Sequence, residues 1–132
     1  VVVEGNKAYV TVRSGGACAG NINQLQVFDI SNVDNPVILS TTEMKNPHGL
    51  GIDNGKLFIC EGQYGLRFMD ASDVKNITTT KLLEGLEAND VIPFENQHRL
   101  LISATNGVYQ YDYSSMTKPL LLSKIAATQH SN

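Results

Sequence analysis

One phrase occurs three times along this chain and decides its fold: LQVFDISNVDNPVILS at 25–40, LRFMDASDVKNITTTK at 66–81 and VYQYDYSSMTKPLLLS at 108–123. Each copy has a few apolar or aromatic residues, an Asp, one further residue, a Ser and then an extended segment. The Asp residues are 41 and 42 positions apart, and a fixed period of this length is typical of a repeat architecture. The aligned anchors are Asp29, Asp70 and Asp112, with Ser31, Ser72 and Ser114.

Two further segments precede the phrase in each unit, so that every unit contains four short extended pieces. Val, Ile, Tyr, Phe and Thr dominate these pieces, as in β-strands, and no segment keeps a 3.6-residue apolar period, which predicts almost no helix. Asp-Asn-Gly at 53–55 and Asn-Gly at 106–107 are typical of hairpin turns. The expected strands are 1–4, 8–13, 24–30, 37–42, 49–53, 56–61, 65–71, 77–83, 90–94, 99–104, 107–113 and 120–126.

Four strands in a unit of about 42 residues match one blade of a β-propeller. We therefore predict an all-β propeller fragment of about three four-stranded antiparallel blades, forming a single domain over 1–132 with almost no helix. The expected blades are about 1–44, 45–86 and 87–128. Because closed propellers have about four to eight blades, two apolar blade faces should stay open. We expect that either the remaining blades of a larger parent propeller or a second copy of the chain covers them.

The composition argues against several classes of partner. Hydrophobic residues make up 42% of the 132 residues, a fraction typical of globular proteins. The net charge of −3 without a basic block argues against nucleic acid, and no apolar run reaches the roughly 18 residues of a membrane span. The chain begins with VVVEG, inside a strand-like run, which favours a piece of a longer protein.

The repeated Asp and Ser residues have a structural interpretation. An Asp carboxylate at the end of a strand accepts hydrogen bonds from the backbone of the turn that follows, and a Ser hydroxyl can act in the same way. Three copies on three blades cannot all be one catalytic residue. We therefore interpret these six residues as structural turn anchors.

The repeated phrase resembles the strand motif of the LVIVD-repeat proteins, a bacterial β-propeller family. GLRFMDAS at 65–72 is the closest copy, LQVFDIS lacks only the Gly, and GVYQYDYS replaces aliphatic residues with Tyr. The segments NPHGLGI and LFICEG also look like parts of lipoproteins from gut Bacteroidetes that carry these repeats. The resemblance covers all three units. It implies a parent protein that is exported to the cell surface or periplasm and anchored by a lipid, with no catalytic residues to carry over.

The segment RSGGACAG at 13–20 lies in an insertion of seven or eight residues between the second and third strands of the first unit. A phosphate-binding loop would need a helix after it, and a catalytic Cys18 would need a His base with a motif around it. Neither is present in the sequence. Two cysteines in an exported chain favour a disulfide between Cys18 and Cys60. The alternative is two free thiols, with Cys60 serving as a small core residue.

His48 begins the first strand of the second unit, and Asn89 and Asp90 hold the corresponding place in the third. In a propeller this innermost strand lines the central channel, and its entry is a common ligand site. A ring of polar groups there could bind a small ligand. The alternative is that they close the channel with water and backbone hydrogen bonds. We predict neither a metal site nor a cofactor.

Three alternate tyrosines of the third unit share one face of a strand. Such a stripe either stacks on sugar rings or a partner, or packs against a neighbouring blade. The packed arrangement is the expected one. The residues are Tyr109, Tyr111 and Tyr113.

Repetition without an acid–base pair or a metal-ligand cluster favours a non-enzymatic scaffold on the cell envelope that binds a protein, a small ligand or a carbohydrate. The alternative is part of a carbohydrate-active propeller enzyme whose catalytic residues lie partly on missing blades. A third possibility is a purely structural set of blades in a multidomain protein. The local acids to test for the enzyme are Glu43, Glu61, Asp90 and Glu95.

Overall fold

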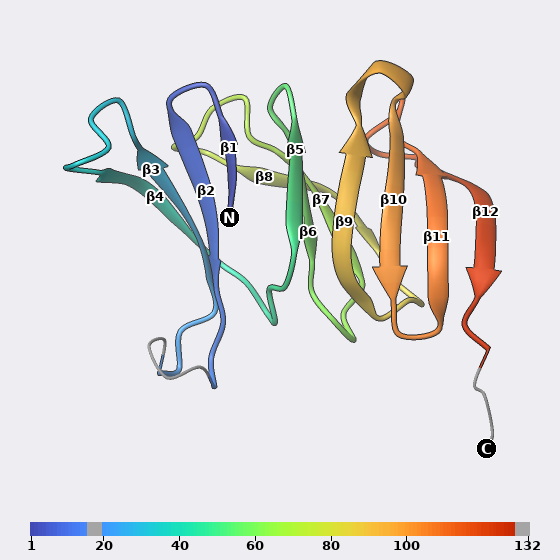
Figure 1. Ribbon diagram of the computed structural model, residues 1–132. Helices are drawn as coiled ribbons and strands as arrows, with labels where there is room; N and C mark the ends of the chain where they lie inside the picture. The colour runs from blue at the N-terminus through green and yellow to red at the C-terminus, as the bar shows by residue number, and fades with distance from the viewer. Residues whose placement is uncertain (16–19, 129–132) are drawn as a thin grey trace.

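The computed structural model describes residues 1–15 and 20–128, and these residues contain twelve β-strands (Figure 1). Each strand pairs antiparallel with its sequence neighbours inside its own sheet, which gives three four-stranded sheets, here called blades 1, 2 and 3 in chain order. Blade 1 comprises β1 (Val2–Glu4), β2 (Lys7–Val12), β3 (Gln24–Asp29) and β4 (Val37–Glu43). Blade 2 comprises β5 (Leu50–Asp53), β6 (Lys56–Cys60), β7 (Leu66–Asp70) and β8 (Thr78–Leu83). Blade 3 comprises β9 (Ala88–Phe94), β10 (Arg99–Ala104), β11 (Gly107–Asp112) and β12 (Leu120–Ala126).

The twelve expected strands are all present, and their ends differ from the expected ones by at most two residues. The helical structure of the described residues is limited to one 3₁₀ turn, η1 (Glu95–Gln97), between β9 and β10. No helix within 1–15 and 20–128 is long and apolar enough to cross a membrane. The prediction of an all-β propeller fragment of three four-stranded antiparallel blades is therefore confirmed.

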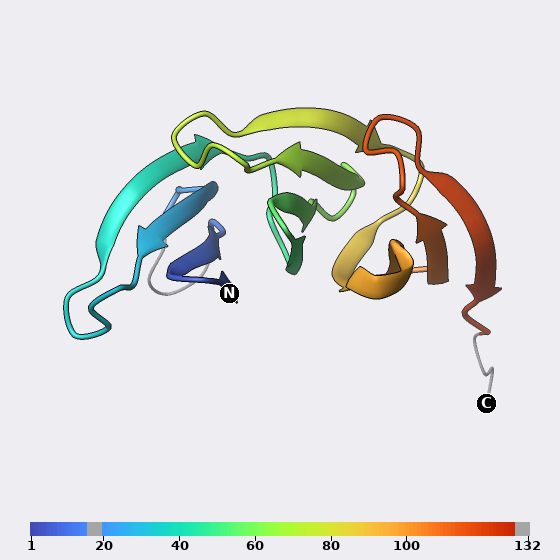
Figure 2. The same ribbon diagram turned by 90° about the horizontal axis from the view of Figure 1, so that it is seen from above.

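The blades stand side by side along an arch (Figure 2). The last strand of each blade, β4, β8 or β12, lies on the outside of the arch. The first strand of each blade, β1, β5 or β9, lies towards its hollow side. His48, which precedes β5, and Asn89 and Asp90, which lie near the start of β9, therefore belong to the inner strands of their blades.

Two hydrophobic cores fill the spaces between the blades. The strand β6 serves both cores, because successive side chains of a strand point to opposite faces. Leu57 and Ile59 pack in the core shared with blade 1, whereas Phe58 and Cys60 pack in the core shared with blade 3. All four side chains are fully buried. Burial on both faces explains why this strand is a continuous apolar run rather than an alternating one.

The third blade contributes its tyrosine stripe to the second core. Tyr109 and Tyr113 are buried in it, and Tyr111 packs against it from a partly buried position. The Tyr113 hydroxyl donates a 2.6 Å hydrogen bond to the carboxylate of Asp53 in blade 2. The prediction that these tyrosines pack on a neighbouring blade is confirmed.

A glycine directly precedes β7 in blade 2 and begins β11 in blade 3, because the outer strand passes too close for a side chain. A Cβ atom on Gly65 would collide with the Leu83 carbonyl oxygen, and one on Gly107 would collide with that of Ile125. Both glycines also have positive φ angles, +97° and +150°. Close backbone approach thus accounts for the Gly that opens two of the three repeated phrases.

The repeated Asp and Ser residues contact each other at the end of the third strand in every blade. The Ser amide donates to the Asp Oδ1 atom two positions earlier, at 2.8 Å for Ser31, 2.9 Å for Ser72 and 2.7 Å for Ser114. The serine hydroxyl and then the serine amide lower the pKa of all three carboxyls below the ordinary value of 3.8. Each carboxylate therefore stabilises the start of the turn to the outer strand.

These pKa shifts predict a loss of stability in acid. A carboxyl whose pKa is lowered in the folded state stabilises the protein at pH values above the pKa that it has in the unfolded state. This stabilisation disappears as the pH falls through the pKa of the folded state. We expect the urea midpoint of the wild type to fall between about pH 5 and pH 2. The fall should be smaller in the triple variant D29N/D70N/D112N, which cannot titrate at these positions, and intermediate in S31A/S72A/S114A. An equal fall in all three proteins would contradict the prediction.

Candidate functional site

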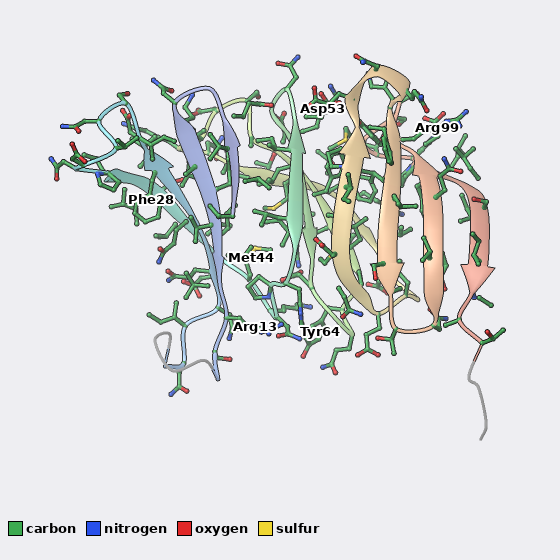
Figure 3. All side chains as sticks on the ribbon, viewed as in Figure 1. Arg13, Phe28, Met44, Asp53, Tyr64 and Arg99 are labelled. Carbon is green, nitrogen blue, oxygen red and sulfur yellow. The ribbon has the colours of Figure 1, made fainter. Side chains whose placement is uncertain are left out.

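An open polar cavity of about 310 Å³ lies at the edge of the blades where β2 ends and β3 begins (Figure 1), and residues from all three blades line it. Figure 3 shows Arg13 and Tyr64 at this end of the molecule, whereas Asp53 and Arg99 lie at the opposite end. The lining residues are Thr11 within β2, Arg13 just after it, Pro47, His48 and Gly49 before β5, and Asn89 in β9. Two of the three residues predicted for the channel entry, His48 and Asn89, thus share one cavity.

Blade 1 supplies two side chains that hold His48 in place. The Thr11 hydroxyl donates a 2.9 Å hydrogen bond to the backbone oxygen of His48. The Arg13 guanidinium contacts both ring nitrogens of His48 and lies 2.8 Å from Nε2. The two residues are 35 positions apart in sequence, so this contact exists only because blades 1 and 2 pack together.

The backbone fixes His48 from the other side. Its amide donates to the Cys60 carbonyl at 2.7 Å, and the next amide, of Gly49, donates to the Asn89 carbonyl at 3.0 Å. A methyl group on Gly62 would lie 3.0 Å from the His48 Nε2 atom, so the ring stands directly over this glycine. The imidazole is therefore held between blades 1 and 2, and the backbone that follows it is hydrogen-bonded to blade 3.

The electrostatic environment favours a neutral imidazole. Partial burial lowers the pKa of His48, the Arg13 charge lowers it further, and Glu87 opposes both effects. A neutral imidazole has one nitrogen that donates a hydrogen bond and one that accepts. Together with the exposed guanidinium of Arg13 and the exposed amide of Asn89, it gives the cavity both donors and acceptors.

Asp90 lies beside this cavity rather than in it. It lines a longer groove of about 550 Å³ that follows β1, β5 and β9 along the inner side of the arch. Gly49 borders both hollows, and a Cβ atom there would collide with the Asp90 carboxylate. The glycine allows β9 to approach β5, and this places Asp90 and Asn89 in adjacent hollows.

The candidate catalytic acids are dispersed. Glu61 is fully buried and accepts bonds from the Lys45 amide (2.6 Å) and the Arg67 side chain (2.7 Å). Glu43 is exposed at the end of β4. Glu95 follows the last residue of β9, whereas Asp90 is near the first residue of that strand. Within the described part of the chain, no group of three or more His, Cys, Asp or Glu side chains is arranged to hold a metal ion.

Cys60 is fully buried in the core between blades 2 and 3, and burial, assisted by the charge of Asp90, raises the pKa of its thiol to about 12. Its predicted partner, Cys18, lies outside the described residues, so the disulfide stays a prediction. The β2–β3 hairpin, whose connection contains Cys18, is eight residues longer than the β6–β7 hairpin, because Lys7 pairs with Asp29 whereas Lys56 pairs with Asp70.

Sequence reasoning missed Thr11 and Arg13. Their positions at the end of an ordinary strand carry no motif, and Arg13 was considered only as part of the segment with Cys18. The one signal in the sequence is their position. Both residues come just before the long β2–β3 connection, at the edge of blade 1 that lies next to His48. No protein-family model matches the chain, and a search of the curated proteins gives no match either.

Proposed function

We propose that this chain is a non-enzymatic binding scaffold and that the cavity around Arg13, His48 and Asn89 takes a small polar ligand, such as a carbohydrate. One observation carries the proposal: three successive blades each place a polar side chain on the same cavity. Ligand sites of propellers and other repeat proteins form where repeats meet, because the units give rigid support to side chains from different segments. The resemblance to LVIVD-repeat lipoproteins supports a location on the cell envelope, where such ligands are accessible.

The chemistry of the cavity favours a ligand with hydroxyl and carboxylate groups. Arginine binds carboxylates with paired hydrogen bonds, and Asn89 and a neutral His48 can both donate to and accept from hydroxyl groups. Acidic oligosaccharides combine both kinds of group. The role of Glu61 in an ion pair with Arg67 weakens the alternative of a carbohydrate-active enzyme, since that carboxylate does not face the cavity.

An array of neutral and acidic oligosaccharides tests the proposal. We expect the wild type to bind acidic members, and Arg13→Ala to weaken this binding about tenfold to a hundredfold, as for the loss of a charge-assisted hydrogen bond. Asn89→Ala should weaken it less, because its amide is uncharged. Lys118→Ala is the matched control, since this exposed cation lies away from the cavity. The proposal fails if no sugar binds, or if Arg13→Ala and Lys118→Ala behave alike.

A further inference from the structure

Blade 3 has an apolar face directed away from blade 2, here called the third-blade open face and formed by Ile92, Leu101, Val108 and Ile125. Leu101 pairs directly with Ile92 across β9 and β10, and Val108 pairs with Ile125 across β11 and β12, so each pair shares one face. Leu100 and Ile102, the neighbours of Leu101, point the other way, into the core with blade 2. The four residues form an exposed patch with a shallow hollow of about 110 Å³ beside β9 and β10.

The same position in blade 2 is buried. Lys56 pairs with Asp70 and Arg99 pairs with Asp112, so Phe58 and Leu101 occupy equivalent places two residues into their strands. Phe58 is 0% exposed because blade 3 covers it, whereas Leu101 is 36% exposed. Blade 3 thus has an apolar residue at the position where blade 2 packs against the next blade.

Blade 1 has a matching surface at the other end of the arch, here called the first-blade open face and formed by Val3, Phe28 and Ile38. Ala8 pairs with Val3 and with Phe28, and Phe28 pairs with Ile38, so the residues form one row across the blade. The equivalents of Val3 and Phe28 in blade 2 are Ile52 and Met69, which are buried against blade 1. Val3 is 56% exposed and Ile52 only 8%.

We propose that a second copy of this chain covers these surfaces, with the third-blade open face of each copy packed on the first-blade open face of the other. The two interfaces within the chain are the model for this contact. In both of them, the face of one blade that corresponds to the third-blade open face packs on the face of the next blade that corresponds to the first-blade open face. The two open faces lie at the two ends of an arch that is open on one side (Figure 2). Head-to-tail contacts between two such arches give a closed ring of six blades, a number within the range of about four to eight found in propellers.

Ring closure has a consequence for the inner groove. The groove of about 550 Å³ is open in a single arch and is bordered by β1, β5 and β9. In the closed pair it becomes part of the wall of a central channel, with one copy of Asp90 on each side. The second copy would therefore complete a site that one chain forms only in part.

Light scattering on the 132-residue chain after size exclusion tests the proposal. We expect twice the chain mass of 14.4 kDa. Leu101→Arg should reduce the mass to that of one chain, because it would bury an unpaired charge in the contact. Val3→Arg should do the same from the other side, with Ile38→Arg as a second variant of that face. Val33→Arg is the matched control, since this exposed residue lies in the β3–β4 turn and should leave the dimer intact. Circular dichroism verifies that each variant is folded.

Mixing the variants distinguishes the head-to-tail contact from a symmetric one. Leu101→Arg keeps an intact first-blade open face and Val3→Arg keeps an intact third-blade open face, so the mixture should recover a dimer with one of the two contacts. A dimer that Leu101→Arg dissociates but that Val3→Arg and Ile38→Arg leave intact would overturn the proposal in favour of contacts between third blades. A wild-type chain that remains a monomer at high concentration would also overturn it and would leave other blades of a parent protein as the occupant.

Discussion

Phe58→Ala is expected to lower the free energy of unfolding by about 3–5 kcal/mol, the range for truncating a buried aromatic side chain. The ring is fully buried on the face of β6 that meets blade 3. It makes edge-to-face contacts with Phe68 and Tyr113, with centroids 5.4 Å and 4.8 Å apart. Its removal leaves a cavity between two blades, and the two sheets cannot close it without moving relative to each other. Guanidinium unfolding monitored by circular dichroism measures the loss.

Leu101→Ala is the matched control for this prediction, because Leu101 occupies the equivalent position of blade 3 and is partly exposed. At protein concentrations at which the chain is monomeric, its truncation should cost less than about 1 kcal/mol. A comparable loss in both variants would contradict the conclusion that the packing of blade 3 on blade 2 determines the burial of Phe58.

Glu61→Ala is expected to cost a similar amount, about 3–5 kcal/mol, for an electrostatic reason. Removing one partner of a buried ion pair leaves the other charge uncompensated. The Glu61 carboxylate is fully buried and lies 2.7 Å from the Arg67 guanidinium, which is itself only 17% exposed. It also accepts the Lys45 amide at 2.6 Å, in the segment that joins blades 1 and 2. The variant therefore loses both a charge partner and an anchor for the segment that precedes His48.

Two further variants separate these contributions. Glu61→Gln keeps an oxygen acceptor for the Lys45 amide but loses the charge, so we expect a smaller loss of stability than for Glu61→Ala. Glu43→Ala removes an exposed acid that accepts a hydrogen bond from Gln24 and should stay within about 0.5 kcal/mol of the wild type. Equal stability of Glu61→Ala and Glu43→Ala would show that the buried pair does not stabilise the fold.

The repeat alone was sufficient to predict the strands and their grouping. Asp70 and the Asp-Asn-Gly turn at 53–55 mark the ends of hairpins whose partners are close in sequence, and such contacts follow from local patterns. The turn has the expected left-handed backbone, with φ of 45° at Asn54 and 77° at Gly55. The register of the β5–β6 hairpin then follows, because this turn pairs Asp53 with Lys56.

The candidate site was only partly predictable. His48 and Asn89 were found because equivalent positions of successive units lie at the same end of their blades. The contact of Arg13 with His48 was not predicted, since it depends on how blade 1 stands against blade 2 after a connection of irregular length. Glu61 illustrates the same difficulty. The sequence does not show whether this glutamate is an exposed acid or a buried partner of Arg67, because only its burial in the fold distinguishes the two.

The sequence by itself determined the strands, the turns and the number of blades, because alternation, turn residues and a 41–42 residue period express contacts within one unit. The tertiary structure decided which apolar residues are covered and which polar residues meet. Phe58 and Leu101 are apolar residues at equivalent positions of their blades, but only Phe58 has another blade packed on it. Contacts between blades depend on the relative placement of whole sheets, and no local pattern of residues encodes that placement.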